Sequence, residues 1–181
     1  MKAGEKVDLK LLVKQTKKGN KESLIKLIMD QKDDYYKLAY IYMKSEADSM
    51  DALQDMIVIV YEKIGNLKKE ESFYSWSKTI LVNECKRKLR ERKKIVSLDQ
   101  VEEEAYEENY SLSEDRALLN KYLSKLSDKH EEVIRLHYLL DLDYESISQM
   151  LNIPLGTVKS RLSIGMGILR DMMRGEIDEG Y

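Results

Sequence analysis

The sequence is poor in residues that interrupt helices. Its 181 residues include one proline and eight glycines. Proline removes a backbone donor, and glycine is the next weakest helix former, so their scarcity favours long helices over strands and tight turns. Leucine, lysine, glutamate and methionine are common here and all suit helices. The composition therefore predicts an all-α fold.

Cysteine and long apolar runs are also scarce. Cys85 is the only cysteine, which excludes an intrachain disulfide and favours a reducing compartment. The longest apolar run, Met56–Tyr61, is far too short to span a bilayer. The first residues, MKAGEKVDLKLLVK, are charged throughout and lack the apolar core of a signal peptide. We therefore expect a cytoplasmic protein without direct membrane insertion.

Charge is unevenly distributed along a chain whose net charge is only −2. Residues 1–96 carry a net charge of +7, residues 97–116 carry −7, and residues 117–181 carry −2. The acidic middle includes VEEEAYEENYS, which has no apolar period and is typical of a flexible segment. The basic first block favours a polyanionic partner.

Hydrophobic periodicity predicts helices on both sides of this acidic segment. In the first block we expect helices at 8–18, at 21–44, from the N-cap Ser49 to Gly65-Asn66, and at 72–94. In the second block we expect helices at 115–126, from the cap Asp128, from the cap Asp143 to Leu151, and at 155–173. The predicted organisation is two small helical domains, 1–95 and 114–175, joined by an acidic flexible linker, 96–113, with a tail at 176–181.

The sharpest motif is YESISQMLNIPLGTVKSRL at residues 144–162. A short helix is followed by Asn152, which tolerates a left-handed backbone, and by Pro154, whose fixed φ angle suits a helix start. Such a helix-turn-helix places its second helix in a DNA major groove. The outward side chains available for bases or phosphates are Thr157, Lys159, Ser160, Arg161 and Ser163. An ordinary helical corner of a bundle is the alternative.

A second motif joins aromatic residues to a basic run within one predicted helix. Phe73, Tyr74 and Trp76 precede Asn83, and seven of the ten residues at 85–94 are basic. Aromatic rings can stack on unpaired bases, an asparagine amide can pair with a base edge, and a basic groove can follow phosphates. The alternative is that Trp76 is a core residue and the basic run is a solvated helix face.

A third and weaker motif is the hexapeptide DALQDM at residues 51–56. Asp51, Gln54 and Asp55 lie on the polar side of a helix whose other side is apolar. An acidic and amide-bearing surface of this kind can dock a protein partner, although a solvated face has the same pattern.

In this order, the three motifs resemble those of the extracytoplasmic-function sigma factors, the smallest members of the bacterial sigma-70 family. The resemblance covers roughly residues 20–95 and 114–172. It implies a factor that binds core RNA polymerase, directs it to promoter DNA and helps to melt the duplex, in a stress or envelope response. Catalysis would stay in the polymerase, so the chain would not be an enzyme. The resemblance also implies control by an anti-sigma factor.

The resemblance further implies a role for each motif. Asp51, Gln54 and Asp55 would contact the polymerase. Leu67, Ile80 and Asn83 would line a pocket for a flipped minus-ten base, with Trp76 at the melted junction. The upstream duplex backbone would be held by Lys86, Arg87, Arg90 and Lys93. Lys159, Ser160 and Ser163 would face the minus-thirty-five element, and Arg161 would grip phosphate. The sequence at 163–166, SIGM, replaces the basic or bulky residues usual in the family, which predicts a weak contact there.

Two other classes of protein are weighed against this interpretation. A stand-alone helix-turn-helix regulator would dimerise to read two half-sites and would need neither the aromatic-basic helix nor the docking helix. A helical enzyme has little support, because His130 and His137 form no recognised metal motif and Cys85 has no nearby histidine in sequence. We expect both histidines to have packing or surface roles, and we expect no cofactor and no metal.

Overall fold

The computed structural model describes the backbone of residues 8–99 and 114–178, and every regular element in these ranges is helical. The chain divides into two compact units, Met1–Tyr106 and Glu107–Tyr181, which we call the N-terminal and C-terminal units. The prediction of an all-α protein is confirmed. Most of the predicted acidic linker, 100–113, and the last residues of the predicted tail, 179–181, lie outside the described residues.

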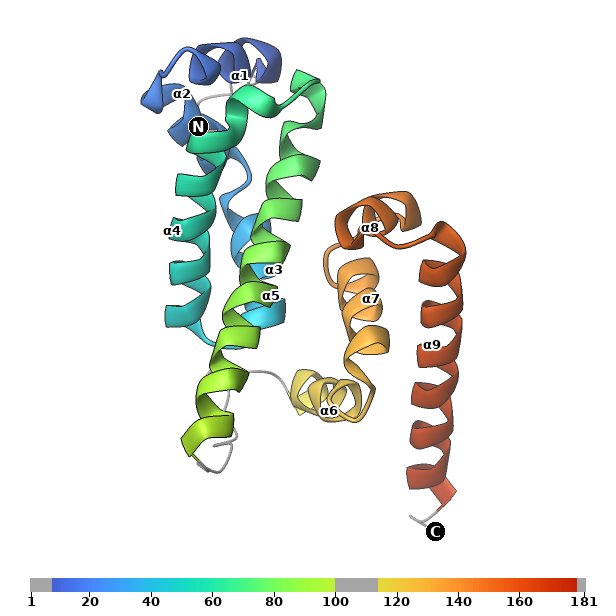
Figure 1. Cartoon of the computed structure of the whole chain (residues 1–181). Coiled ribbons are helices and arrows are strands. Elements are labelled where there is room, and N and C mark those ends of the chain that lie inside the picture. The colour runs from blue at the N-terminus through green and yellow to red at the C-terminus, as the bar shows by residue number, and fades with distance from the viewer. Residues whose placement is uncertain (1–7, 100–113, 179–181) are drawn as a thin grey trace. The chain divides into compact units, whose positions relative to one another are not determined.

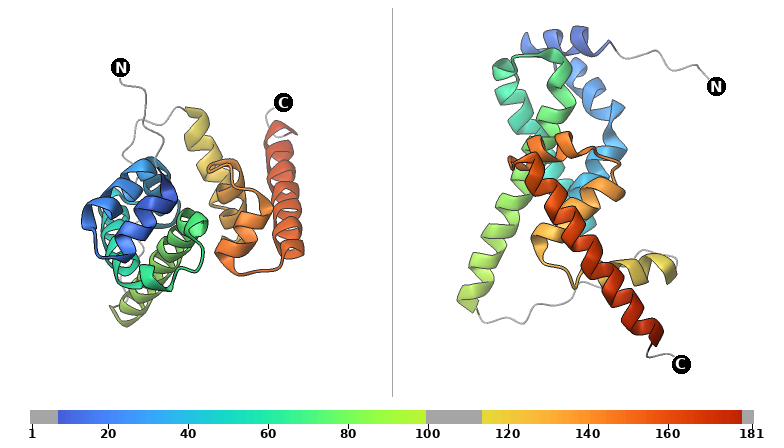
Figure 2. Two further views of the ribbon diagram at one scale, coloured as in Figure 1. Left: turned by 90° about the horizontal axis from the view of Figure 1, so that it is seen from above. Right: turned by 90° about the vertical axis from the view of Figure 1, so that its right-hand side faces the viewer.

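The described residues of the N-terminal unit form a bundle of three long helices. Two shorter helices lie across one end of it (Figures 1 and 2). The short helices are α1 (Leu9–Lys17) and α2 (Lys21–Asp30), and the bundle is formed by α3 (Lys32–Met43), α4 (Glu46–Lys63) and α5 (Phe73–Asp99). Two single turns of 3-10 helix, η1 (Ile64–Asn66) and η2 (Glu70–Ser72), connect α4 to α5. The helix α5 therefore continues five residues beyond the predicted end at residue 94.

Large side chains from all three long helices form the core of this bundle. Tyr35, Leu38, Met56, Phe73 and Leu81 are each at most 1% exposed. Burial of such a side chain stabilises a fold by about 1.5–3 kcal/mol, so these contacts fix how the long helices pack together.

Two local predictions in this unit were wrong. The single helix expected at 21–44 is broken at Gln31, because α2 packs on α1 whereas α3 packs on α4 and α5. A straight helix could not bring both apolar faces to their separate partners. The N-cap of α4 is Ser45, whose Oγ accepts from the Asp48 N–H, while the predicted cap Ser49 is buried inside the helix and bonds the Ser45 carbonyl.

The part of the C-terminal unit that the structure describes contains four helices: α6 (Glu114–Leu123), α7 (Asp128–Tyr138), α8 (Tyr144–Leu151) and α9 (Leu155–Asp178). Helix α9 packs on α7 and α8, and the core includes Val133, Leu136, Ile147 and Val158, all fully buried. Asp128 is the first helical residue of α7 rather than its cap, because Ser127 occupies the extended cap position. The predicted cap Asp143 is confirmed, since its Oδ1 accepts from the Ser146 N–H at 2.7 Å.

Candidate nucleic-acid interface

Polar contacts fix the first turns of α5 in the N-terminal unit. The hydroxyl oxygens of Tyr35 and Ser77 lie 2.6 Å apart in the core, and the Tyr74 hydroxyl donates to Asp30 Oδ2 at 2.7 Å. Burial raises the pKa of Tyr35 to about 12, so its hydroxyl keeps its proton at neutral pH. These contacts tie α5 to α2 and α3, and they determine which of its sides faces outward.

The predicted DNA-binding residues of α5 share one side of the helix. Trp76, Ile80, Asn83, Arg87 and Arg90 are spaced alternately by four and three residues, which places them in one row along the helix. Trp76 and Ile80 are half-buried, whereas the other three are exposed. This side of α5 therefore presents apolar surface first, then an amide, then cations.

Lys86 and Lys93 are the other two residues of α5 that are predicted to contact DNA. Lys86 is half-buried, and its Nζ lies 5.9 Å from the centre of the Tyr42 ring. Contact between a cation and an aromatic face holds its stem against the bundle. Lys93 lies within α5, but its side chain is outside the described residues.

Arg87, which is predicted to hold DNA, is bound to carboxylates of the protein itself. Its Nε lies 3.0 Å from both carboxylate oxygens of Glu84, and its Nη1 lies 2.6 Å from Glu91 Oε1. Glu84 is only 5% exposed and needs a charged partner there. Its hydrogen bond to Arg87 is the largest contribution that raises the Arg87 pKa above the usual value, followed by that of Glu91. A DNA phosphate would have to replace these contacts.

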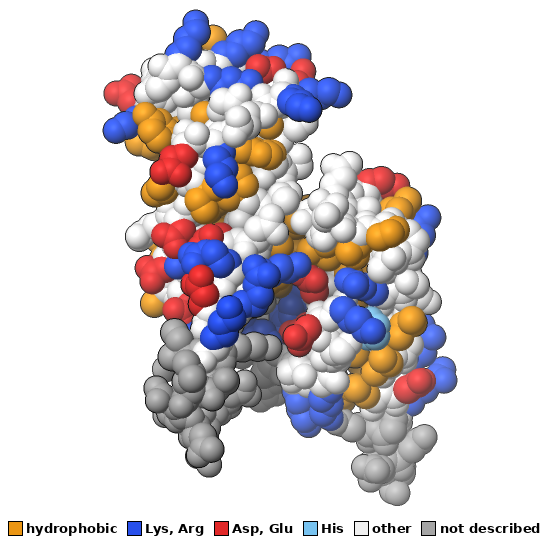
Figure 3. Space-filling model, in the orientation of Figure 1, with side chains coloured by type: hydrophobic (Ala, Val, Ile, Leu, Met, Phe, Trp, Pro, Cys, Tyr) orange, Lys and Arg blue, Asp and Glu red, His pale blue; other side chains and the backbone are white. Residues whose placement is uncertain are grey.

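The predicted docking residues on α4 differ in how far they are available to a partner. Asp51 and Gln54 are exposed, but Asp55 lies 2.7 Å from Lys88 Nζ of α5. The hydrogen bond to Asp55 is the main cause that raises the pKa of Lys88. Figure 3 shows acidic and basic side chains interspersed over the facing parts of α4 and α5. The sequence predicted that Asp55 contacts polymerase and that Arg87 contacts DNA. In the structure Asp55 Oδ2 and Arg87 Nη2 lie 3.8 Å apart.

Leu67, predicted to line a base pocket, is buried at 6% exposure in the connection between α4 and α5. Its carbonyl oxygen accepts a hydrogen bond from Lys17 Nζ at 2.8 Å. In this conformation Leu67 positions the connection rather than offering its side chain to a ligand. Lys17 belongs to no motif, so no sequence signal indicated this contact.

The helix-turn-helix of the C-terminal unit has the predicted geometry. Asn152 adopts the left-handed conformation, with φ 53° and ψ 49°. The Ser148 hydroxyl donates to the Ile153 carbonyl at 2.6 Å and closes the turn. Ile147 of α8 and Val158 of α9 are fully buried where the two helices pack. The first turns of α9 are thereby held as a separate, outward-facing element.

The predicted recognition residues lie on the first half of α9. Lys159, Ser160 and Ser163 are exposed, whereas Thr157 and Arg161 are half-buried. The Ser160 hydroxyl donates to the Thr157 carbonyl at 3.1 Å. Burial is the first cause that lowers the pKa of His130 on α7, and the charges of Lys129 and Arg161 add to it. This surface carries few cations for a duplex-binding helix.

The unusual sequence at 163–166 has a packing explanation. A Cβ atom at Gly165 would lie 2.7 Å from Ile134 Cδ1 and 3.2 Å from His130 Cβ of α7. Glycine therefore permits the close approach of α7 and α9. Sequence comparison alone interpreted this position as weakened DNA contact.

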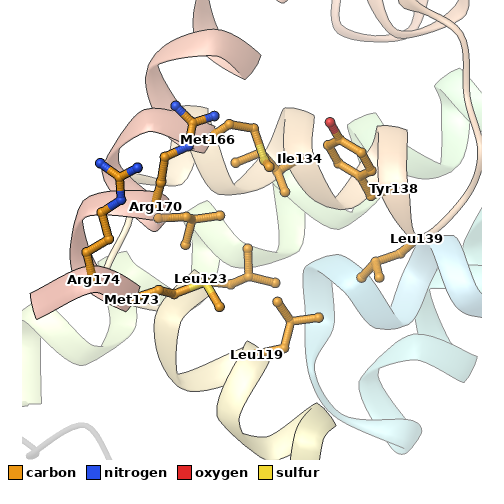
Figure 4. Close-up of a pocket in the computed structure, with 10 residues that line it drawn as sticks. Leu119, Leu123, Ile134, Tyr138, Leu139, Met166, Arg170, Met173 and Arg174 are labelled. Atoms are coloured by element: carbon orange, nitrogen blue, oxygen red, sulfur yellow. The ribbon is translucent and has the colours of Figure 1, made fainter. Parts of the chain in front are cut away.

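An apolar pocket of about 490 Å³ lies between α6, α7 and α9, and sequence reasoning did not predict it. Figure 4 shows its arginines together at one edge. The pocket is lined by Leu119, Leu123, Ile134, Tyr138, Leu139, Met166, Leu169, Arg170, Met173 and Arg174. No motif marks it, because its lining residues are scattered over three helices.

Cys85, His130 and His137 are held by contacts within the protein. Burial raises the pKa of the Cys85 thiol to about 12, which leaves it uncharged and unreactive at neutral pH. His137 Nδ1 lies 2.7 Å from the Leu142 carbonyl oxygen, and His130 Nδ1 lies 3.1 Å from Ser127 Oγ. Among the described side chains, no three His, Cys, Asp or Glu residues cluster as metal ligands. Within the described ranges, no helix has the length and apolar content to cross a bilayer.

Comparison with known proteins places both units in one family. Residues 27–95 match the family described as Sigma-70 region 2, and residues 116–166 match Sigma-70, region 4. The chain is 30% identical over 183 residues to the ECF RNA polymerase sigma factor SigW of Bacillus subtilis (strain 168), covering 92% of this chain and 97% of the relative. It is 29% identical over 164 residues to the RNA polymerase sigma factor SigV of the same organism, covering 88% and 96%.

A solved structure supports the fold. The sigma factor RpoE of Bartonella quintana, crystallised in complex with the anti-sigma factor NepR, matches with a TM-score of 0.68 and 22% identity, covering 82% of this chain and 95% of that chain. Family matches in both units, together with near full-length similarity to SigW, identify the family of the protein. The chain belongs to the sigma-70 family of RNA polymerase sigma factors, as a member of its extracytoplasmic-function (ECF) group.

Proposed function

We propose that this sigma factor docks on core RNA polymerase through α4, opens the minus-ten element of promoter DNA with α5, and contacts the minus-thirty-five element with α9. The observation that carries the proposal is the single outward row on α5 from Trp76 to Arg90. Along it, half-buried apolar residues are followed by Asn83 and then by cations. That order suits a boundary between opened bases and intact duplex.

The energetics favour such a row as a trap for opened DNA. Unstacking and unpairing a base costs a few kcal/mol, and stacking on an aromatic side chain returns about 1–3 kcal/mol per base. One captured base can therefore offset much of the cost of its own opening. Exposed Arg90 and the neighbouring lysines would hold the adjacent duplex through phosphates, which carry most of the affinity of DNA-binding proteins.

The C-terminal unit is proposed to bind DNA weakly by itself. Lys159 and Arg161 are the cations among its predicted contact residues, and Arg161 is half-buried. Tight promoter binding would come from holding two weak units against one duplex, since linkage raises the effective concentration of the second site. The proposed functional domains are 1–95 and 114–175, with the polymerase bringing both to the promoter.

The partners follow from this mechanism. The factor would act in the cytoplasm, where it meets core polymerase and promoter DNA, and phosphodiester chemistry would remain with the polymerase. The RpoE of Bartonella quintana was solved with an anti-sigma factor bound, which supports an anti-sigma partner for this chain as well. A stress or envelope response is the proposed setting.

Run-off transcription with purified bacterial core polymerase and a set of genomic fragments tests the proposal. We expect the factor to co-elute with core enzyme and to produce discrete transcripts that core enzyme alone does not make. Failure to co-elute would contradict it. A footprint on DNA without polymerase would instead favour a stand-alone helix-turn-helix regulator. Such a regulator would bind two half-sites as a dimer.

A further inference from the structure

The connection between α4 and α5 is attached to α1 by a lysine outside every recognised motif. Lys17 Nζ donates to the Leu67 carbonyl oxygen at 2.8 Å and to Glu70 Oε1 at 3.1 Å. The side chains of Lys17 and Glu70 are each only 24% exposed. One ammonium group therefore binds both halves of the connection, which lies next to α1 at the end of the bundle (Figure 1).

A second lysine of α1 makes a weaker contact with the same connection. Lys10 Nζ lies 2.6 Å from Glu71 Oε1, but the two side chains are 61% and 56% exposed. Exposed pairs of this kind contribute little, because water competes and two long side chains must be ordered. Lys17 has partly buried partners and two acceptors, so it is the principal anchor.

These pairs also separate the charges of the connection. Glu70 and Glu71 both pair with lysines of α1, but only Glu70 is half-buried, and Lys68 and Lys69 are exposed. A backbone hydrogen bond is the main cause that lowers the pKa of Glu70, and the hydrogen bond from Lys17 adds to it. Glu70 is consequently held against α1, whereas Lys68, Lys69 and Glu71 form the exposed edge of the connection.

Other contacts also fix the backbone of the connection. Leu67 and Lys69 have extended conformations, with φ/ψ of −67°/113° and −122°/121°. Its local backbone hydrogen bonds include Leu67 N–H to the Ile64 carbonyl and Ser72 N–H to the Lys69 carbonyl, at 3.1 Å each, and Phe73 N–H to the Glu70 carbonyl. Burial of the Ile64 and Leu67 side chains anchors its first half. The Lys17 bond to the Leu67 carbonyl adds a hydrogen bond to the extended stretch between the two 3-10 turns, and so helps to determine where this backbone lies.

We propose that Lys17 is a positioning residue for base selection: by holding the Leu67 carbonyl and Glu70, it sets the place of the connection that packs against α5 and leads into it. The Ile80–Asn83 part of α5 is where an opened base would be read. This rests on the proposed function of α5. Lys17 itself touches no DNA. Its loss should therefore alter which base is preferred, while the phosphate contacts of α5 stay unchanged.

The test measures base preference directly. Holoenzyme is assembled from core polymerase and each variant, and opens a library of promoter fragments randomised across the melted element. Opened fragments are recovered by permanganate reactivity at unpaired thymines and sequenced. Lys17→Met removes the charge and both hydrogen bonds but keeps the aliphatic stem. Lys17→Arg is the conservative rescue, and Lys10→Met is the matched control on the same helix.

We expect Lys17→Met to lower the preference at one position of the element roughly tenfold, equivalent to about 1.4 kcal/mol of discrimination. Lys17→Arg should restore it, Lys10→Met should resemble the wild type, and the salt dependence of promoter binding should be the same in all four proteins. An unaltered base profile in Lys17→Met would overturn the proposal.

A second variant distinguishes a general loss of stability from a specific positioning role of Lys17. Val13→Ala truncates a fully buried residue of α1 without removing either contact of Lys17. Equal flattening of the profile by Val13→Ala and Lys17→Met would overturn a specific positioning role. If the wild-type factor opens no fragment with core enzyme, the proposed function falls together with this inference, whereas an unaltered Lys17→Met profile removes the inference alone.

Discussion

Lys88 Nζ of α5 lies 2.7 Å from a carboxylate oxygen of Asp55 on α4. The helix proposed to meet polymerase and the helix proposed to meet DNA are thus joined by an ion pair between a predicted docking residue and the basic run. Asp55 can act in two ways, by holding the helices together or by contacting the polymerase, and the two actions can be separated.

A charge exchange distinguishes these roles of Asp55. Asp55→Lys alone puts a cation beside Lys88 and should destabilise the N-terminal unit. Asp55→Lys combined with Lys88→Asp should restore the ion pair. The coupling energy of such a pair at a partly exposed site is about 0.2–1 kcal/mol. If Asp55 also contacts polymerase, the exchanged protein should fold normally but bind core enzyme more weakly. Thermal unfolding and core-binding titrations measure the two effects. Full recovery of both would mean that Asp55 serves only the α4–α5 pair.

Arg87 and Arg90 share one row on α5 but should behave differently when replaced. Arg90→Ala should reduce the slope of log affinity against log salt by about one, as expected for one lost phosphate contact. Arg87→Ala should leave the slope nearly unchanged and lower the unfolding temperature, because it removes the charged partner of the buried Glu84. Salt titrations of holoenzyme on one promoter fragment provide the comparison. A slope reduced equally by both would show that Arg87 leaves Glu84 for DNA.

The sequence predicted some features of this protein but not the Asp55–Lys88 and Arg87–Glu84 ion pairs. The helix-turn-helix followed from local rules: Asn152 at a left-handed position and Asp143 at an N-cap are chosen by their own backbone conformation. The class of fold followed from periodicity and the scarcity of helix breakers. The break at Gln31 did not, because it depends on which helices α2 and α3 pack against. The pairing of Arg87 with Glu84 could be suspected from their spacing, but the burial of Glu84 could not.

Gly165 and Gly167 of α9 provide a test of the packing between α7 and α9. Gly165→Ala should destabilise the C-terminal unit by about 1–3 kcal/mol, the usual cost of overpacking, because its Cβ would lie 2.7 Å from Ile134 Cδ1. At Gly167 nothing lies within 4 Å of a Cβ, so Gly167→Ala should stabilise the helix by about 0.5–1 kcal/mol. Urea unfolding gives the free energies, and hydrogen exchange of α7 and α9 localises them. Stabilisation by both replacements would mean that α7 yields easily.

The stability of the C-terminal unit should depend on pH through His130. Its pKa is lowered below the ordinary value of 6.5, chiefly by burial and further by Lys129 and Arg161. The unfolded chain therefore binds a proton at a higher pH than the folded unit does, and stability rises with pH across the interval between the two pKa values. We expect full stability above pH 6.5 and a progressive loss as the pH falls through the folded-state value. NMR titration of His130, with unfolding midpoints from pH 5 to 8, measures both quantities. In His130→Gln this part of the pH dependence should vanish, and its persistence would assign it to another group.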